Sequence, residues 1–202
     1  MADAAMISTE LYLCRHGQTD WNAEGRLQGQ EDIPLNALGR EQARRNGLCL
    51  RNILGAGASG FSFLSSPLGR AVETMRIIRT ELDLPPDDFE TDPRLVELHF
   101  GDWQGSTLDE VRKSDPEGPK RRKADKWNFV PPGEKAESYA LLAERVRPVF
   151  ENLSRPTIVT AHGGVSRCIL RMYGGFDDRA AARGDIAQDR ILHWLDGGLT
   201  WV

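Results

Sequence analysis

The residues with the clearest chemical potential stand directly after a short apolar run near the amino terminus. Residues 11–14 have the composition of a buried strand, and Arg15, His16 and Gly17 follow without a spacer. Ligands of open α/β sheets bind at the carboxyl ends of strands, so a guanidinium and an imidazole placed there suit oxyanion recognition beside a nucleophile or base. On its own, the triplet is also compatible with a structural histidine and a solvated arginine.

Three further segments place polar residues near predicted strands. They are residues 65–74 with Arg70, residues 95–105 with Glu97, and residues 161–164 with His162. The apolar runs 61–65 and 156–161 predict two strands, and the second, being nearly continuous, is typical of a central parallel strand covered on both faces. We therefore expect His16 and His162 to lie at the carboxyl edge of one sheet. Taken alone, Arg70 is typical of a solvated helix residue, and Glu97 is compatible with an exposed loop carboxylate.

Taken in order, these four segments resemble the motifs of the histidine phosphatase superfamily, the phosphoglycerate mutase-like proteins, and in particular its shorter phosphatase branch. The resemblance extends from about residue 11 to about residue 173. It implies an α/β fold, a three-layer α/β/α sandwich with a mostly parallel central sheet and a small helical cap. We expect a single domain over residues 1–202, with the cap inserted at about 98–136.

The resemblance also implies a role for each polar residue. His16 is expected to be the nucleophile that forms a phosphohistidine, and Glu97 the general acid. The expected phosphate- and substrate-binding residues are Arg15, Arg70 and His162, joined more loosely by Asn22, Gln28, Gly29 and Gly163. As a nucleophile, His16 must be neutral, with a backbone carbonyl accepting the hydrogen of its other ring nitrogen.

The implied activity is that of a metal-independent phosphomonoesterase acting on a small phosphorylated metabolite, with no cofactor and no metal site. Two alternatives stay open: a cofactor-dependent phosphoglycerate mutase and a non-catalytic module that binds a phosphorylated ligand. True mutases of the family carry a long insertion after the acid. Here residues 98–105 lead directly to a capping box that begins at Thr107, which favours the phosphatase branch.

Composition restricts the partners and the location. The net charge of −4 gives no support for a nucleic-acid partner, and no apolar run approaches the roughly 20 residues of a membrane helix. Residues 1–6 lack the pattern of a secretion signal, so we expect a cytoplasmic protein. Cys14, Cys49 and Cys168 match no zinc or redox spacing, which favours reduced thiols. A homodimer through an exposed sheet edge or hairpin stays possible.

The remaining periodicity predicts the elements around the site. Helices are predicted at residues 36–50, from Pro67 to about 81, at 137–153 and at 165–173, followed by an antiparallel hairpin at 191–202. The pattern places Leu38, Leu48 and Leu141 on buried helix faces, Asn36 at a helix cap and Pro67 in a first helical turn.

The segment 114–135 is rich in proline, glycine and charge, and is the candidate cap. Its basic run, residues 120–123, is interpreted as a solvated face, with a phosphate-rich substrate as the alternative. Residues 132–138 are two residues longer than the Pro-Gly-Gly-Glu-Ser turn of the phosphatase branch. This departure affects the expected fit of the substrate under the cap and leaves the core reaction unchanged.

Overall fold

The computed structural model describes residues 7–202, so the prediction made for residues 1–6 lies outside the described part. The strands are β1 (Leu11–Arg15), β2 (Ser62–Ser65), β3 (Glu90–Thr91), β4 (Thr157–Ala161), β5 (Ile191–Leu195) and β6 (Gly198–Trp201). The helices are α1 (Asp20–Ala23), α2 (Ala37–Leu54), α3 (Gly69–Glu81), α4 (Leu108–Ser114), α5 (Gly118–Ala124), α6 (Tyr139–Glu151), α7 (Gly163–Met172) and α8 (Asp178–Arg183). Short 3₁₀ helices occupy Gly55–Gly60, Pro93–Leu95 and Gly101–Trp103.

The strands form one six-stranded sheet in the order β3-β2-β4-β1-β5-β6. The first four in that order are parallel, whereas β5 pairs antiparallel with β1 and β6 pairs antiparallel with β5. The predicted mostly parallel sheet and carboxyl-terminal hairpin are therefore confirmed. β4 is buried along its whole length, as its continuous apolar sequence requires for a strand covered on both faces.

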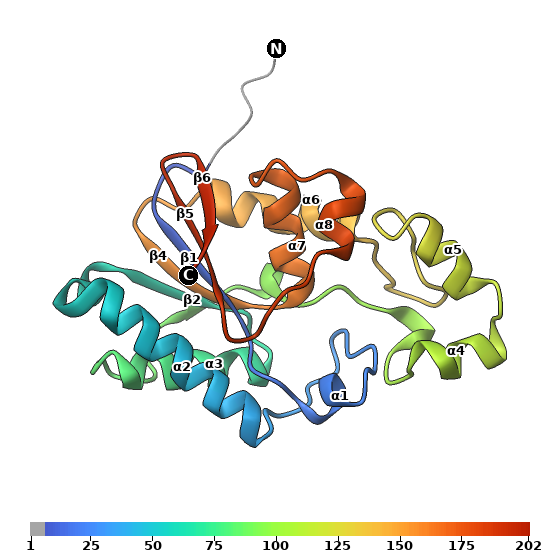
Figure 1. Ribbon diagram of the computed structural model, residues 1–202, viewed down its shortest axis with the longest axis horizontal. Coiled ribbons are helices and arrows are strands. Elements are labelled where there is room, and N and C mark those ends of the chain that lie inside the picture. The colour runs from blue at the N-terminus through green and yellow to red at the C-terminus, as the bar shows by residue number, and fades with distance from the viewer. Residues whose placement is uncertain (1–6) are drawn as a thin grey trace, which may run out of the picture.

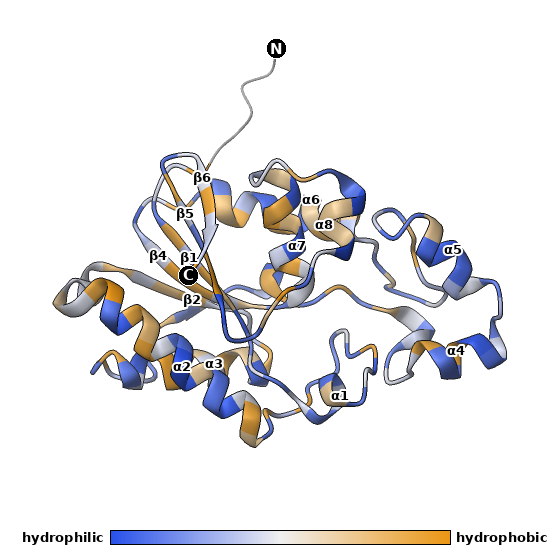
Figure 2. Ribbon diagram, in the orientation of Figure 1, coloured by the Kyte–Doolittle hydropathy of each residue, from blue (hydrophilic) through white to orange (hydrophobic). Residues whose placement is uncertain are grey.

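Helices cover both faces of the sheet, which gives the three expected layers (Figure 1). On one face, Tyr12 and Cys14 of β1 pack in a cluster with residues of α2 and α3. Leu11 and Leu13 point to the opposite face and join the larger cluster formed with α6, α7 and α8. Alternate residues of a strand point to opposite faces, so the short run 11–14 contributes to both clusters. The strands accordingly appear among the most hydrophobic parts of the ribbon (Figure 2).

The buried face of α2 differs from the prediction. Leu38 and Leu48 are 47% and 40% exposed, and small residues such as Gly39, Ala43 and Gly47 are buried instead. A Cβ added to Gly47 would come within 2.7 Å of Glu81 Cβ on α3. The two helices therefore approach closely over a stripe without bulky side chains. Ala43 and Leu50, which were also predicted to face inward, are buried, so hydrophobicity identified only part of the buried face.

Several helix boundaries also differ from those expected. α3 begins at Gly69 with Leu68 as its cap, so Pro67 precedes the helix and does not occupy its first turn. α7 starts at Gly163, directly after His162, because this turn already has helical hydrogen bonds. On α6, Leu141 was predicted to be buried but is 44% exposed.

The sequence did not predict α8.

The segment that was expected to form a cap contains α4 and α5, which extend to one side of the sheet (Figure 1). α5 is mainly hydrophilic (Figure 2), but Trp103 and Trp127, which flank the two helices in sequence, belong to the larger apolar cluster. The capping box predicted at Thr107 is present at the start of α4. Within residues 7–202, no helix combines the length and apolar character needed to cross a membrane.

Candidate active site

The register of the central strands brings the two histidines of the sequence motifs together. Arg15 of β1 lies opposite Ala161 of β4, and the backbone N–H of His16 donates to the carbonyl of Ala161 at 2.9 Å. His16 and His162 thus leave neighbouring parallel strands at the same level, and their ring centroids are 5.1 Å apart. Both side chains are buried, at 3% and 0% exposure. Parallel pairing of β1 with β4 therefore brings the two histidines together, as the sequence predicted.

His16 has the hydrogen-bonding arrangement expected of a nucleophile. Its Nδ1 lies 2.7 Å from the carbonyl of Gly17, so Nδ1 carries the hydrogen and donates it to that oxygen. Nε2 then holds the free electron pair. Burial, reinforced by the charges of Arg70 and Arg15, holds the pKa of His16 well below its usual value of 6.5. The imidazole is therefore neutral at physiological pH.

His162 is oriented by the first residue after β2. Its Nε2 lies 2.7 Å from Ser66 Oγ, and Ser66 Oγ already accepts the backbone N–H of Leu68 at 3.4 Å. The Ser66 hydroxyl hydrogen is thus available to Nε2, which leaves a hydrogen on Nδ1. Nδ1 is buried and has no hydrogen-bond partner among residues 7–202.

Two buried guanidinium groups flank the histidines, and backbone carbonyls hold them in place. Arg70 is 1% exposed and donates to the carbonyls of Glu31 and Gly29 at 2.6 and 2.7 Å. Arg15 donates to the carbonyl of Ile186 at 2.7 Å. Burial lowers the pKa of both groups, and that of Arg70 falls to about 10. The Nε atom of each arginine is buried without a partner in the described chain.

Unpartnered buried N–H groups are rare because burying a polar group without a hydrogen bond costs free energy. Here several of them belong to residues of the predicted phosphate site: Nε of Arg15, Nε of Arg70, Nδ1 of His162 and Nε2 of Gln28. An anion with several acceptor oxygens can satisfy such donors together, which a single water molecule does less well.

Glu97 contributes a carboxylate to the site. Its Oε1 accepts the backbone N–H of Leu98 and its Oε2 that of Gly164, each at 3.0 Å. Gly164 lies in the first turn of α7, where free N–H groups favour a negative charge. Glu97 is the only carboxylate among the described residues that line the cavity at this site.

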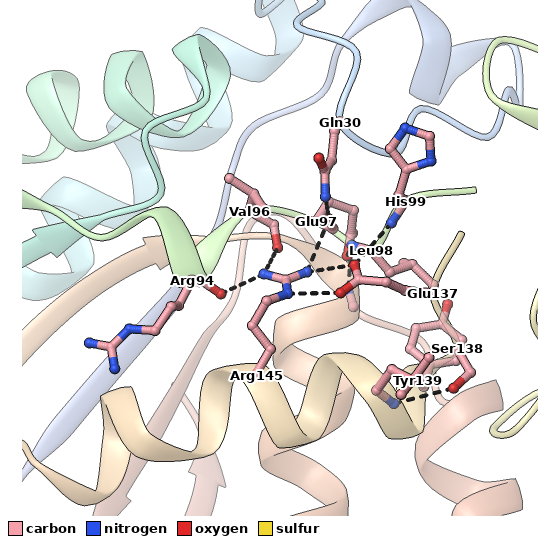
Figure 3. A network of polar contacts seen from close by, with 12 residues as sticks. Gln30, Arg94, Val96, Glu97, Leu98, His99, Glu137, Ser138, Tyr139 and Arg145 are labelled. Atoms are coloured by element: carbon pink, nitrogen blue, oxygen red, sulfur yellow. Dashed lines mark hydrogen bonds and ion pairs between the residues drawn. The ribbon is translucent and has the colours of Figure 1, made fainter. Parts of the chain in front are cut away.

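A network around Arg145 of α6 holds the segment that carries Glu97 (Figure 3). Arg145 donates to the carbonyls of Arg94 and Val96 at 2.6 and 3.1 Å, and weakly to that of Glu97 at 3.4 Å. Two of its nitrogens also bind the carboxylate of Glu137 at 2.9 and 2.7 Å. We did not single out Arg145 from the sequence. It lies in the middle of α6, whereas Glu137 precedes the Ser138 cap of that helix.

The more loosely matched residues also lie at the site. Asn22 donates to Gln28 Oε1 at 3.3 Å and accepts from Gln188, so it orients the Gln28 amide whose Nε2 is unpartnered. Gly29 acts through its backbone, because its carbonyl binds Arg70 and its φ of +54° suits glycine. Gly163 lines the cavity next to Arg15.

The cavity has a volume of about 200 Å³. Of the predicted site residues, all except the fully buried His162 line it. Residues 120–123 are exposed at three of their four positions, as predicted for a solvated face, but Arg122 lines the cavity. Sequence reasoning also missed a further set of lining residues: Arg26, Leu27, Phe100, Lys126, Tyr139, Gly164 and Arg167.

Comparison with known families assigns the chain. The family model of the histidine phosphatase superfamily (branch 1) matches residues 11–200. The chain belongs to this superfamily. The resemblance inferred from the four motifs is therefore confirmed, and so is the phosphoglycerate mutase-like fold expected from it.

Relatives of this histidine phosphatase superfamily member include phosphatases and phosphoglycerate mutases. A glucosyl-3-phosphoglycerate phosphatase from Mycolicibacterium vanbaalenii is 35% identical over 167 residues, covering 77% of this chain and 69% of the relative. A probable phosphoglycerate mutase from Serratia proteamaculans is 31% identical over 209 residues, covering 96% and 90%. The solved complex of a mycobacterial glucosyl-3-phosphoglycerate phosphatase with VO3 superposes with a TM-score of 0.76 at 27% identity, covering 96% of each chain.

Proposed function

We propose that this histidine phosphatase superfamily member hydrolyses phosphomonoesters of small metabolites through a phosphohistidine on His16. The single observation that carries the proposal is the site around His16: a neutral Nε2 beside buried, unpartnered donors of Arg15, Arg70 and His162. A tetrahedral phosphoryl group offers the oxygens that these donors lack. The phosphatase relatives support the same reaction class.

In the first step, Nε2 of His16 attacks phosphorus in line with the ester bond. The new N–P bond forms as the P–O ester bond breaks, and Glu97 donates its proton to the departing oxygen. Arg15, Arg70 and protonated Nδ1 of His162 stabilise the charge on the equatorial oxygens. These donors are held by protein carbonyls and Ser66 before the substrate arrives, so little reorganisation is needed.

In the second step, Glu97, now a carboxylate, accepts a proton from a water molecule that attacks phosphorus. The N–P bond breaks, inorganic phosphate leaves, and Glu97 regains its acidic form while Nε2 of His16 regains its electron pair. The backbone N–H groups of Leu98 and Gly164 stabilise the ionised carboxylate between the two steps. Asn22, Gln28, Gly29 and Gly163 complete the proposed substrate-binding set.

Rapid quenching with a radiolabelled phosphomonoester tests the proposal. We expect label bound to the wild-type protein through an acid-labile, alkali-stable bond, and no label on His16→Ala. The matched control is His193→Gln, because His193 binds Glu10 and stacks on Tyr12 at a distance from the cavity. Stoichiometric ligand binding without label or phosphate release would instead support the non-catalytic module.

The mutase is retained as a second candidate because a probable phosphoglycerate mutase is among the relatives. Incubation with phosphoglycerate and a bisphosphoglycerate primer distinguishes the two activities. Hydrolysis predicts release of inorganic phosphate in step with loss of substrate. Rapid interconversion of phosphoglycerates with negligible release would assign the mutase.

Four further expectations stay predictions: a single domain over residues 1–202, a cap at about 98–136, a cytoplasmic location and a homodimer. Light scattering coupled to gel filtration measures the oligomeric state. Limited proteolysis with and without vanadate checks whether the segment 98–136 becomes protected when the site is filled.

A further inference from the structure

Three cations of the cavity are held by backbone carbonyls in the last turn of α8 and just after it. Lys126 Nζ donates to the carbonyl of Ala182 at 2.6 Å, and Arg167 donates to that of Gly184, also at 2.6 Å. Arg15 donates to the carbonyl of Ile186 at 2.7 Å, two residues farther along. Alternate carbonyls of residues 182–186 therefore place a lysine and two arginines side by side along one wall of the cavity.

Among the described residues, the cations of this wall are not paired with carboxylates, although the charges of Glu97 and Asp185 are close enough to Arg15 to oppose the lowering of its pKa. Within residues 7–202, none of Arg15, Arg122, Lys126 and Arg167 forms an ion pair with a carboxylate, although most other arginines do. Neutral carbonyls orient Arg15, Lys126 and Arg167 and leave their charge available, whereas Arg122 lies over the ring of Phe100. Arg15 and Arg70 already match the two charges of a phosphate dianion. The cavity therefore holds more positive charge than one phosphate needs, and the excess is carried by Lys126, Arg122 and Arg167.

The surroundings of Lys126 are unusually unfavourable for a cation. Its amine is largely buried, with Arg122 of α5, Arg167 of α7 and Arg183 of α8 near it and the ring of Tyr139 of α6 at 5.7 Å. Burial, and then the charges of these three arginines, lower the pKa of Lys126 to about 7. An anion bound among these groups would offset their mutual repulsion, and a lysine with no such ligand has no evident reason to be buried there.

The position of Arg167 connects this cluster to the phosphate site. Its charge lowers the pKa of Arg15 as well as that of Lys126, so it lies near both. Arg15, Arg167 and Lys126 also line the same cavity of about 200 Å³. One small molecule can therefore reach the phosphate donors and the cluster at the same time.

We propose that Arg122, Lys126 and Arg167 bind a second anionic group of the substrate, carried by the same small molecule whose phosphate reacts at His16. This inference rests on the proposed function and narrows its substrate class to phosphomonoesters with a carboxylate or a second phosphate a few bonds away. Both groups offer oxygens to the same donors, and the substrates used in the test distinguish them.

The first test compares three substrates with matched three-carbon chains on the wild-type protein. These are glycerol phosphate, phosphoglycerate and propanediol bisphosphate. We expect kcat/KM to be at least about tenfold higher for one or both doubly anionic compounds than for glycerol phosphate, as hydrogen bonds to charged groups are worth this much. Preference for phosphoglycerate identifies a carboxylate, and preference for the bisphosphate a second phosphate. Equal values for all three would overturn the inference, whereas hydrolysis of none would overturn the proposed function.

The second test removes one charge inside the cluster and one just outside it. Lys126→Met is expected to lower the ratio of kcat/KM for the preferred doubly anionic compound to that for glycerol phosphate by about tenfold. The control is Lys123→Met, which removes the same charge from the exposed side of α5, three residues away. We expect it to leave the ratio unchanged. Equal ratios in Lys126→Met and wild type would exclude Lys126 from the subsite.

The pH dependence of the wild-type ratio tests the same residue without a variant that could fail to fold. Free Lys126 loses its proton as the pH rises through about 7, so the preference for a second anion should weaken between pH 6 and 8.5. Titration of the reacting phosphate affects both substrates and cancels in the ratio. Phosphoglycerate is the doubly anionic substrate for this test, because its carboxylate stays ionised over the whole range whereas a second phosphate would itself titrate. A ratio that is constant over this range would contradict the assignment of Lys126.

Discussion

The carboxylate of Glu97 lies directly against the backbone of Gly164. Oε2 of Glu97 accepts the Gly164 N–H at 3.0 Å, and a Cβ atom at position 164 would overlap Oε1. Gly164 is two residues after His162, in the first turn of α7. The proposed proton donor and the proposed phosphate site are therefore fixed to the same turn, and this contact permits no side chain at position 164.

Gly164→Ala should displace Glu97 while leaving His16 in place. Alanine is otherwise favoured in a helix, so the variant should fold. We expect kcat for an alkyl phosphate to fall by roughly 10²–10⁴, the usual contribution of general acid–base catalysis. A nitrophenyl ester, whose leaving group needs no proton, should still phosphorylate His16 in a burst. Gly60→Ala, where an added Cβ meets nothing within 4 Å, is the control. An unchanged kcat for the alkyl ester would refute the role given to this contact.

Arg145→Lys should loosen the segment that carries Glu97, since lysine cannot bind Glu137 and the carbonyls of Arg94 and Val96 together. A displacement of about 1 Å is enough to lower kcat by roughly 10²-fold. In a Glu97→Gln background the same substitution should cause little further loss, because it acts through Glu97. Arg147→Lys, on the exposed side of α6, serves as the matched change. Additive losses in the double variant would show that Arg145 acts elsewhere.

His16 should remain neutral under mildly acidic conditions. Because burial and the nearby arginines hold its pKa well below 6.5, lowering the pH from 7.5 to about 5.5 should not protonate its ring. NMR of the imidazole proton resonances should show His16 and His162 untitrated over this range, since the pKa of His162 is lowered in the same way. A normal titration of the His16 resonance near pH 6.5 would contradict the assignment of a neutral nucleophile.

Vanadate should inhibit competitively, because its trigonal bipyramidal adduct resembles the transition state of phosphoryl transfer. Arg15 and Arg70 supply the positive charge that the transferred group requires, and neutral His162 adds an N–H donor, so incubation with a chelator should leave kcat unchanged. Steady-state assays with and without chelator, and at several vanadate concentrations, measure both effects. Strict dependence on added magnesium would disprove this prediction.

Lys126→Met should stabilise the fold near neutral pH. The folded chain lowers the pKa of Lys126 from 10.5 to about 7. Between these pH values, the amine is therefore less protonated in the folded chain than in the unfolded chain. Below pH 7, burying the charged amine lowers the free energy of unfolding by its full amount. This destabilisation decreases as the pH rises from 7 to 10.5. The melting temperature of Lys126→Met should exceed that of the wild type at pH 6.5, and the difference should shrink by pH 9.5. Lys123→Met should follow the wild type throughout.

Local sequence determined the reacting groups of this protein. The apolar runs at 11–14 and 156–161 specify strands, and a strand that ends in a polar residue delivers that residue to the edge of a parallel sheet. His16 and His162 could therefore be placed together before the fold was known, whereas Arg70 was added only through the resemblance to the family's motifs. The expected hydrogen bond from His16 to a backbone carbonyl also followed, because a nucleophilic imidazole needs one fixed tautomer.

Only the tertiary structure decided which side chains support and surround those groups. Leu38 and Leu48 were assigned to the core by hydrophobicity, but the close approach of α2 and α3 requires small residues there and leaves both leucines exposed. The hydrogen bonds of Arg145, and those that hold Lys126 and Arg167, reach carbonyls 17 to 56 residues away in the chain. Such contacts have no periodicity or local composition, because they arise where separately folded elements meet, and the sequence motifs are silent about them.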